Sequence, residues 1–93
     1  MRNLVISSSF KRAFKNFTKR QPELKAKIEE TLRLLATDPY HPSLRTHKLK
    51  GKLLGAWACS VEYNCRIVFS FQKSQTAEEE IFLIDIGTHD EVY

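Results

Sequence analysis

The last seven residues of the chain, Gly87 to Tyr93, carry the side chains best suited to proton transfer. His89 can gain or lose a proton near neutral pH, and Tyr93 offers a flat ring and a hydroxyl group. Both follow the apolar run 81–86, which predicts a buried strand that ends at the edge of a sheet. The alternative is a surface histidine beside a tyrosine that packs as a plug at the C-terminus.

Arg66 is the second candidate, and it lies in the strongest strand pattern of the chain, residues 65–71. The odd-numbered positions of this segment are all apolar and predict the face that meets a core. Because successive strand side chains point to opposite faces, we expect Arg66 on the uncovered face. A solvated strand arginine, or one paired with Glu62 or Asp85, is the alternative interpretation.

The same alternation assigns faces in the last strand. It places Asp85 on the uncovered face with Arg66, and His89 stays on that side if the extended backbone continues. Tyr93, four residues after His89, comes near these residues if the tail makes one helical turn. The pattern therefore predicts that one open sheet face gathers the candidate residues. The core-facing side chains expected in this strand are Phe82, Ile84 and Ile86.

The rest of the pattern predicts the elements that position these residues. An aromatic stripe at helical spacing after Ser7 predicts one amphipathic helix, and an apolar stripe between Pro22 and Asp38 predicts a second. A polar connector and three strands with short links follow. We therefore predict an α+β fold in which a helical hairpin packs on one face of an antiparallel sheet of about four strands. The expected strands are residues 4–6, 56–61, 65–71 and 81–86.

The length of 93 residues predicts a single domain over residues 1–93. No apolar run approaches the roughly 20 residues that span a bilayer, and the apolar start is too short for a signal peptide, so we expect a cytoplasmic protein without a membrane partner. Cys59 and Cys65 are expected to be free buried thiols. Because no nearby histidine pair joins them, we predict no metal site and no cofactor.

The charge is divided unevenly along the chain. Residues 1–52 contain 13 Lys and Arg against 4 Asp and Glu, a net charge of +9, whereas residues 53–93 contain 2 against 7, a net charge of −5. A basic region of this size is typical of proteins that bind polyanions. Solvated helix faces or an acidic partner protein would account for it equally.

The order and spacing of four segments resemble the RelE/ParE superfamily of bacterial toxin–antitoxin toxins, and within it the YafQ-like branch. The resemblance covers nearly the whole chain. The segments that carry it are Leu34-Leu35 with Asp38-Pro39, then His47-Lys48-Leu49-Lys50-Gly51, then Trp57 and Val61 with Arg66-Ile67-Val68-Phe69, and finally Gly87-Thr88-His89 followed by Tyr93.

This resemblance implies a ribosome-dependent mRNA endoribonuclease that a co-expressed acidic antitoxin neutralises. Its partners would be the antitoxin, the ribosome and mRNA, with operator DNA bound only through the antitoxin complex. Two histidines and a terminal aromatic act at the scissile site in the YafQ-like branch, and they correspond to His47, His89 and Tyr93. The strand arginine corresponds to Arg66. One alternative is a ParE-like toxin that inhibits DNA gyrase by binding; another is an inactive or nucleic-acid-binding member whose main partner is an antitoxin.

RNA cleavage of this kind needs a base for the 2′-hydroxyl, positive charge at the phosphate and an acid for the leaving 5′-oxygen. We assign Arg66 to the phosphate and His89 to proton transfer, with His47 as the second proton-transfer group or a phosphate contact and Tyr93 as a stacking ring. The chain departs from the branch at Ser60 and Asn64, where the branch carries a His and an Asp, so fewer general bases are available. The residues expected to hold the RNA backbone are Arg45, Lys48, Lys50 and Lys52.

Overall fold

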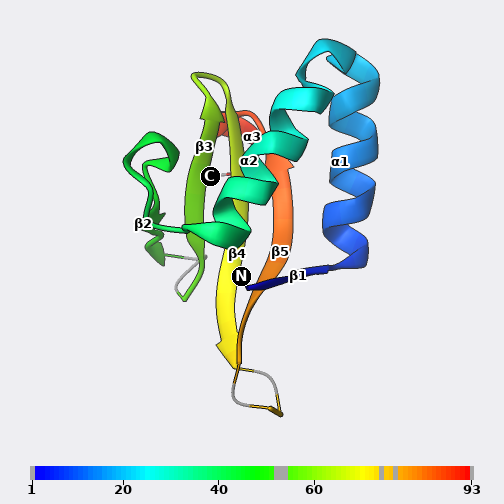
Figure 1. Cartoon of the computed structure of the whole chain (residues 1–93). Coiled ribbons are helices and arrows are strands. Elements are labelled where there is room, and N and C mark those ends of the chain that lie inside the picture. Colours follow the sequence, from blue (N-terminus) through cyan, green and yellow to red (C-terminus); the bar gives the residue numbers. More distant parts are fainter. Residues whose placement is uncertain (1, 52–54, 74, 77, 93) are drawn as a thin grey trace.

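The computed structural model describes residues 2–51, 55–73, 75–76 and 78–92. Its five-stranded sheet has the order β1-β5-β4-β3-β2, and two long helices and one short helix pack against it (Figure 1). The strands are β1 Asn3–Ile6, β2 His47–Lys48, β3 Trp57–Glu62, β4 Cys65–Lys73 and β5 Glu79–Gly87. The helices are α1 Ser8–Arg20, α2 Lys25–Thr37 and α3 His89–Val92, and short 3-10 turns span Pro22–Leu24 and Pro42–Leu44.

The two long helices form the predicted hairpin. Ser7 caps α1, because its hydroxyl accepts a hydrogen bond from the backbone N–H of Phe10 at 3.0 Å. Pro22 opens the turn that leads into α2, where its missing N–H costs nothing. The second helix ends at Thr37, directly before Asp38, where the predicted helical stripe ends.

The predicted α+β fold is confirmed, and the sheet differs from the expectation in two details. Strands β3, β4 and β5 form the expected antiparallel meander, but β1 pairs with β5 in parallel. Strand β2 adds a fifth member, because residues 47–48 pair with β3 inside the segment read as a polar connector. Two polar residues carry no alternation that could reveal a strand.

Each face of the sheet carries its own apolar cluster. The main core lies between the sheet and the helical hairpin, and Figure 1 shows α2 crossing in front of the strands while α3 lies behind them. The second cluster is smaller and lies on the α3 side, so the face expected to be open is partly covered. This second cluster consists of Leu49, Ala56, Ala58, Val68 and Val92, with Ile84 packed against it.

The predicted faces in β5 are right for Asp85 and Ile86 but wrong for Phe82 and Ile84. The pairing of β4 with β5 shifts by one residue at Ile84, which is extra on the β5 side. An extra residue inverts the alternation beyond it, so a parity counted from the end of the strand fails in its first half. The residues that face the main core there are Ile81 and Leu83.

Candidate active site

Two rows of paired residues cross the sheet on the face opposite the helical hairpin. Directly opposite residues in paired strands point to the same face, so each row shows which side chains lie together. The rows place His47, Arg66 and Asp85 on this face, and α3 packs over the same face through Val92. One row runs His47, Ala58, Val68 and Asp85, and the next runs Ser60, Arg66 and Gly87.

The Arg66 guanidinium is held by neutral groups. Its Nη1 donates to the Ser60 hydroxyl at 2.9 Å and to the Glu62 backbone carbonyl at 2.6 Å. Within the described residues, no carboxylate lies at ion-pair distance from it. The pairing with Glu62 or Asp85 carboxylates that the sequence left open is therefore not formed. An oriented arginine whose charge is not neutralised suits an incoming phosphate.

Arg45 and Arg66 share a groove of about 330 Å³ at the end of the sheet near the β3–β4 turn. Ser60 lies on its wall, and the neighbouring Tyr63 is 94% exposed at the turn itself. Two guanidinium groups around one groove produce a positive potential in which an anionic backbone can bind. The other lining residues are Ser43, Val61 and Glu62.

His47 lies on β2 and is held by its neighbour Arg45. Its Nδ1 is 2.9 Å from the Arg45 carbonyl oxygen, which can only accept a hydrogen bond. In the neutral ring this contact requires the proton on Nδ1. Arg45 itself has a left-handed backbone with φ of 51°, an uncommon conformation that turns the chain into β2.

His89 is the first residue of α3, and its side chain is 58% exposed. Its Nδ1 lies 3.8 Å from Oδ1 of Asp90. The turn begins with a reciprocal cap: the Glu91 N–H donates to the Thr88 hydroxyl at 3.2 Å, and the Thr88 N–H donates to Oε1 of Glu91 at 2.9 Å. Sequence reasoning missed this cap, although Thr-x-x-Glu is its usual signature.

Asp85 was placed on this face by the sequence but was given no role. Burial raises the pKa of its carboxyl group, the backbone N–H of Ile86 partly lowers it again at 2.8 Å, and the charge of Glu91 adds a further rise. The group therefore holds its proton to a higher pH than an ordinary aspartate. A half-buried carboxyl with that property on the same face as Arg66 is an additional candidate for proton transfer.

The remaining predicted residues do not all join this face. Lys48 has the opposite parity to His47 and lies 5.4 Å from the Trp57 ring centroid, on the side of the main core. Lys50 is exposed. Lys52 and Tyr93 lie outside the described residues.

His41 caps the turn Pro42–Leu44. Its Nδ1 accepts a hydrogen bond from the Ser43 N–H at 3.1 Å. This places His41 in a local structural contact and makes it a useful comparison for His89.

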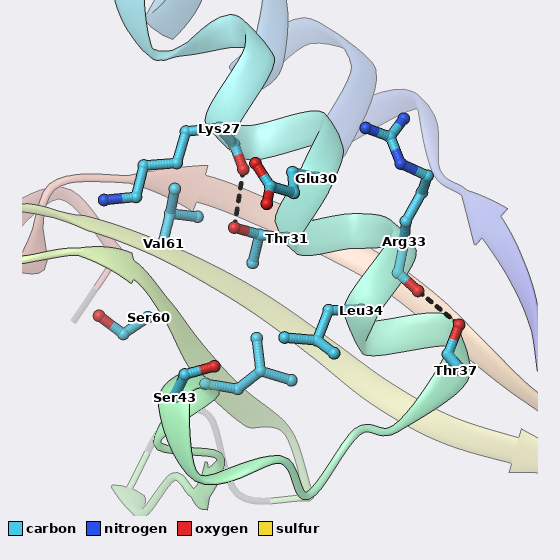
Figure 2. Close-up of a pocket in the computed structure, with 10 residues that line it drawn as sticks. Lys27, Glu30, Thr31, Arg33, Leu34, Thr37, Ser43, Ser60 and Val61 are labelled. Atoms are coloured by element: carbon cyan, nitrogen blue, oxygen red, sulfur yellow. Dashed lines mark hydrogen bonds between the residues drawn. The ribbon is translucent and has the colours of Figure 1, made fainter.

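A wider groove of about 620 Å³ lies between α2 and β3 (Figure 2). Its floor is apolar and its rim is charged, with Lys27, Glu30 and Arg33 along α2. It adjoins the Arg66 groove, since both are lined by Ser43, Ser60 and Val61. Among the described residues that line it there is no histidine; His47 lies on the other face of the sheet, and His89 lies on α3.

Cys59 and Cys65 are free and buried, as predicted. Burial raises the pKa of both thiols to about 12, so they stay protonated at neutral pH and are not nucleophiles. Among the described residues, no three His, Cys, Asp or Glu side chains are grouped as a metal site would require. No helix in the described ranges is long and apolar enough to cross a membrane.

Solved structures of bacterial toxins share this fold. YafQ from E. coli strain BL21(DE3) superposes with a TM-score of 0.80 at 16% identity, over 100% of this chain and 99% of that one. The E. coli DinJ–YafQ toxin–antitoxin complex gives 0.78 at 18%, over 99% and 97%. A metal-bound toxin from Helicobacter pylori gives 0.76 at 26%, over 100% of both chains.

The sequence itself decides the family. No curated protein matches it. The family model described as the bacterial toxin of type II toxin–antitoxin system, YafQ, matches residues 2–93. Toxins of this family are of the endoribonuclease type, and YafQ cuts mRNA during translation. The resemblance to the YafQ-like branch is thereby confirmed, and the chain belongs to the YafQ family of toxins of bacterial type II toxin–antitoxin systems.

Proposed function

We propose that this toxin is a metal-independent endoribonuclease that cuts mRNA on the ribosome, in the cytoplasm. The observation that best supports the proposal is the shared position of Arg66 and His47 on one sheet face, beneath the turn that carries His89. The groove between Arg45 and Arg66 offers the positive charge that a phosphate needs. The family relationship supports the same activity.

The proposed reaction uses the RNA's own 2′-hydroxyl. Its oxygen forms a bond to the adjacent phosphorus as a base takes its proton, and the bond from phosphorus to the 5′-oxygen breaks as an acid protonates the leaving oxygen. The products are a 2′,3′-cyclic phosphate and a 5′-hydroxyl. Each positioned acid or base contributes typically 10²–10⁴-fold to the rate. No step requires a metal ion.

Four side chains receive roles in this reaction. Arg66 binds the phosphate and stabilises the charge that develops on it, because its planar guanidinium can contact two oxygens at once. His89 transfers a proton, and His47 is the second proton-transfer group or a phosphate contact. Tyr93 stacks on a base.

The RNA backbone is held by basic side chains around this face. Arg45 contributes directly, because it lines the Arg66 groove. Lys48, Lys50 and Lys52 belong to the same connector and provide longer-range attraction.

The protein partner is a cognate antitoxin. One of the solved structures with this fold is the E. coli DinJ–YafQ toxin–antitoxin complex. An acidic antitoxin would complement the net charge of +9 in residues 1–52, where 13 Lys and Arg stand against 4 Asp and Glu. Operator DNA is contacted only through the antitoxin complex.

Primer extension on a defined message in a reconstituted translation reaction tests the proposal. We expect cuts with ribosomes, none without them, and the same cuts after the toxin has been treated with a chelator and desalted. Loss of cutting after chelation would contradict metal independence, and cutting of free RNA would contradict the ribosome dependence. Growth arrest on expression without any cuts would favour a toxin that binds DNA gyrase.

A further inference from the structure

Glu91 fixes the end of α3 at which His89 lies. Its carboxylate accepts a hydrogen bond from the Thr88 N–H at 2.9 Å, and its own N–H donates to the Thr88 hydroxyl at 3.2 Å. These two hydrogen bonds join the residues that flank His89 and Asp90 in the turn. The far end of the turn is anchored separately, by the buried Val92. The Glu91 carboxylate thus adds a side-chain contact at the His89 end to the backbone hydrogen bonds that the Glu91 and Val92 N–H groups donate to the Thr88 carbonyl, both at 3.1 Å.

Arg20, the last residue of α1, holds the same carboxylate. Its Nη2 donates to Oε2 of Glu91 at 3.0 Å and to Oε1 at 3.2 Å. Its guanidinium carbon lies 5.6 Å from the centroid of the buried Phe17 ring, which orients the arginine from the hairpin side. The Thr88 backbone hydrogen bond and then the Arg20 contact lower the pKa of Glu91, so the carboxylate stays ionised and the contacts persist into mild acid.

Gly87 provides the space for this arrangement. A Cβ atom at position 87 would lie 3.1 Å from both Cβ and Oε1 of Glu91 and 3.4 Å from Cγ1 of Val92. The two distances to Glu91 are tighter than ordinary van der Waals contacts, so a Cβ atom here would require Glu91 to shift by a few tenths of an ångström. The close approach of strand β5 to the turn therefore depends on glycine.

We propose that Glu91 and Arg20 are positioning residues for His89, an inference that rests on the proposed nuclease function. A single helical turn of four residues is unstable by itself and takes its geometry from its contacts. The backbone of the turn sets the direction of the His89 Cα–Cβ bond, and so the direction in which the imidazole leaves the chain. The Arg20–Glu91 latch ties that backbone to the end of the helical hairpin.

A latch of this kind affects rate more than stability. Exposed ion pairs contribute little to folding, and Arg20 and Glu91 are 55% and 44% exposed. A displacement of a reacting group by about 1 Å, in contrast, can cost up to about 10²-fold in rate. Loss of the latch should therefore lower the rate of the chemical step while binding of the ribosome complex and melting temperature change little.

Single-turnover cleavage on programmed ribosomes tests this inference. For Glu91→Ala we expect the maximum rate to fall about tenfold, with the half-saturating toxin concentration within about twofold of wild type. Glu91→Gln and Arg20→Ala keep part of the contact and should each lose about threefold, and Gly87→Ala, which displaces Glu91 without removing its carboxylate, should lose about as much. The matched control is Glu79→Gln, which weakens a similarly exposed ion pair with Arg2 in the same way that Glu91→Gln weakens the Arg20 pair, and it should cut at the wild-type rate.

The results separate two kinds of failure. If wild type cuts and His89→Ala does not, but Glu91→Ala reaches the wild-type maximum rate, the positioning role is wrong and the nuclease proposal stands. If wild type does not cut, the nuclease proposal is itself wrong. Amide hydrogen exchange at Thr88 and Glu91 then still tests the latch, because it should accelerate in Arg20→Ala and not in Glu79→Gln.

Discussion

At the scale of single residues, the candidate site depends on an arginine held by uncharged partners. Arg66 donates to Ser60 and to the Glu62 carbonyl, which orient the guanidinium without neutralising it. Ser60, where the resemblance implied the loss of a general base, supplies a hydrogen-bond acceptor for Arg66. The sequence alone predicted the face of Arg66. The hydrogen-bond partners of its side chain could not be predicted, because they depend on the register of β3 against β4.

Arg66→Lys tests whether geometry, beyond charge, matters at the phosphate. Lysine keeps the positive charge but cannot present two parallel donors, so we expect the maximum cleavage rate to fall about 10- to 100-fold. Arg33→Lys on α2 is the matched control and should cut as wild type does. Equal rates for the two variants would show that Arg66 contributes charge alone.

Asp85 gives a pH-dependent prediction about stability. Burial raises its pKa in the folded protein above the unfolded value, so the ionised form costs stability at neutral pH, and the cost disappears as the pH falls below about 4. Asp85→Asn should therefore raise the melting temperature at pH 7 by a few degrees at most and leave it unchanged at pH 3.5. A gain of the same size at both pH values would contradict the assignment to burial.

At the scale of elements, the sequence predicted both long helices and the three-stranded meander, because each has a strong apolar period and clear end signals. The assignment of side chains to sheet faces failed in the first half of β5, because every position from Ile81 to Ile84 is apolar and shows no alternation. The extra residue at Ile84 becomes visible only through pairing with β4. Strand β2 was not predicted, because its two residues have no apolar alternation and are recognised as a strand only by their pairing with β3.

The packing of α2 against the sheet provides a test of the main core. Ile28 is fully buried in that interface, so Ile28→Ala should lower the free energy of unfolding by about 2–5 kcal/mol. Tyr63→Ala at the exposed β3–β4 turn should cost less than about 0.5 kcal/mol. Urea denaturation measures both, and similar losses for the two variants would contradict the assigned core.

At the scale of the whole molecule, the sheet separates two surfaces. The helical hairpin lies on one side of the sheet and α3 on the other (Figure 1). The groove of Figure 2 lies on the hairpin side, and the row that contains His47 and Asp85 lies on the α3 side. The Arg45–Arg66 groove adjoins the groove of Figure 2 at the end of the sheet. The Arg20–Glu91 contact links the two sides at one end of the molecule. Such a contact lies between residues 71 positions apart, and no local sequence pattern could have revealed it.

The central claim is that His89 transfers a proton during cleavage of mRNA on the ribosome. The most direct measurement compares wild type, His89→Ala and His41→Ala by primer extension on the same translated message, at a temperature at which all three are folded. We expect His89→Ala to lose at least about 100-fold in cutting rate, while His41→Ala, which lacks only the cap of the Pro42–Leu44 turn, cuts like wild type. Cutting by His89→Ala at the wild-type rate would contradict the proposed role of His89.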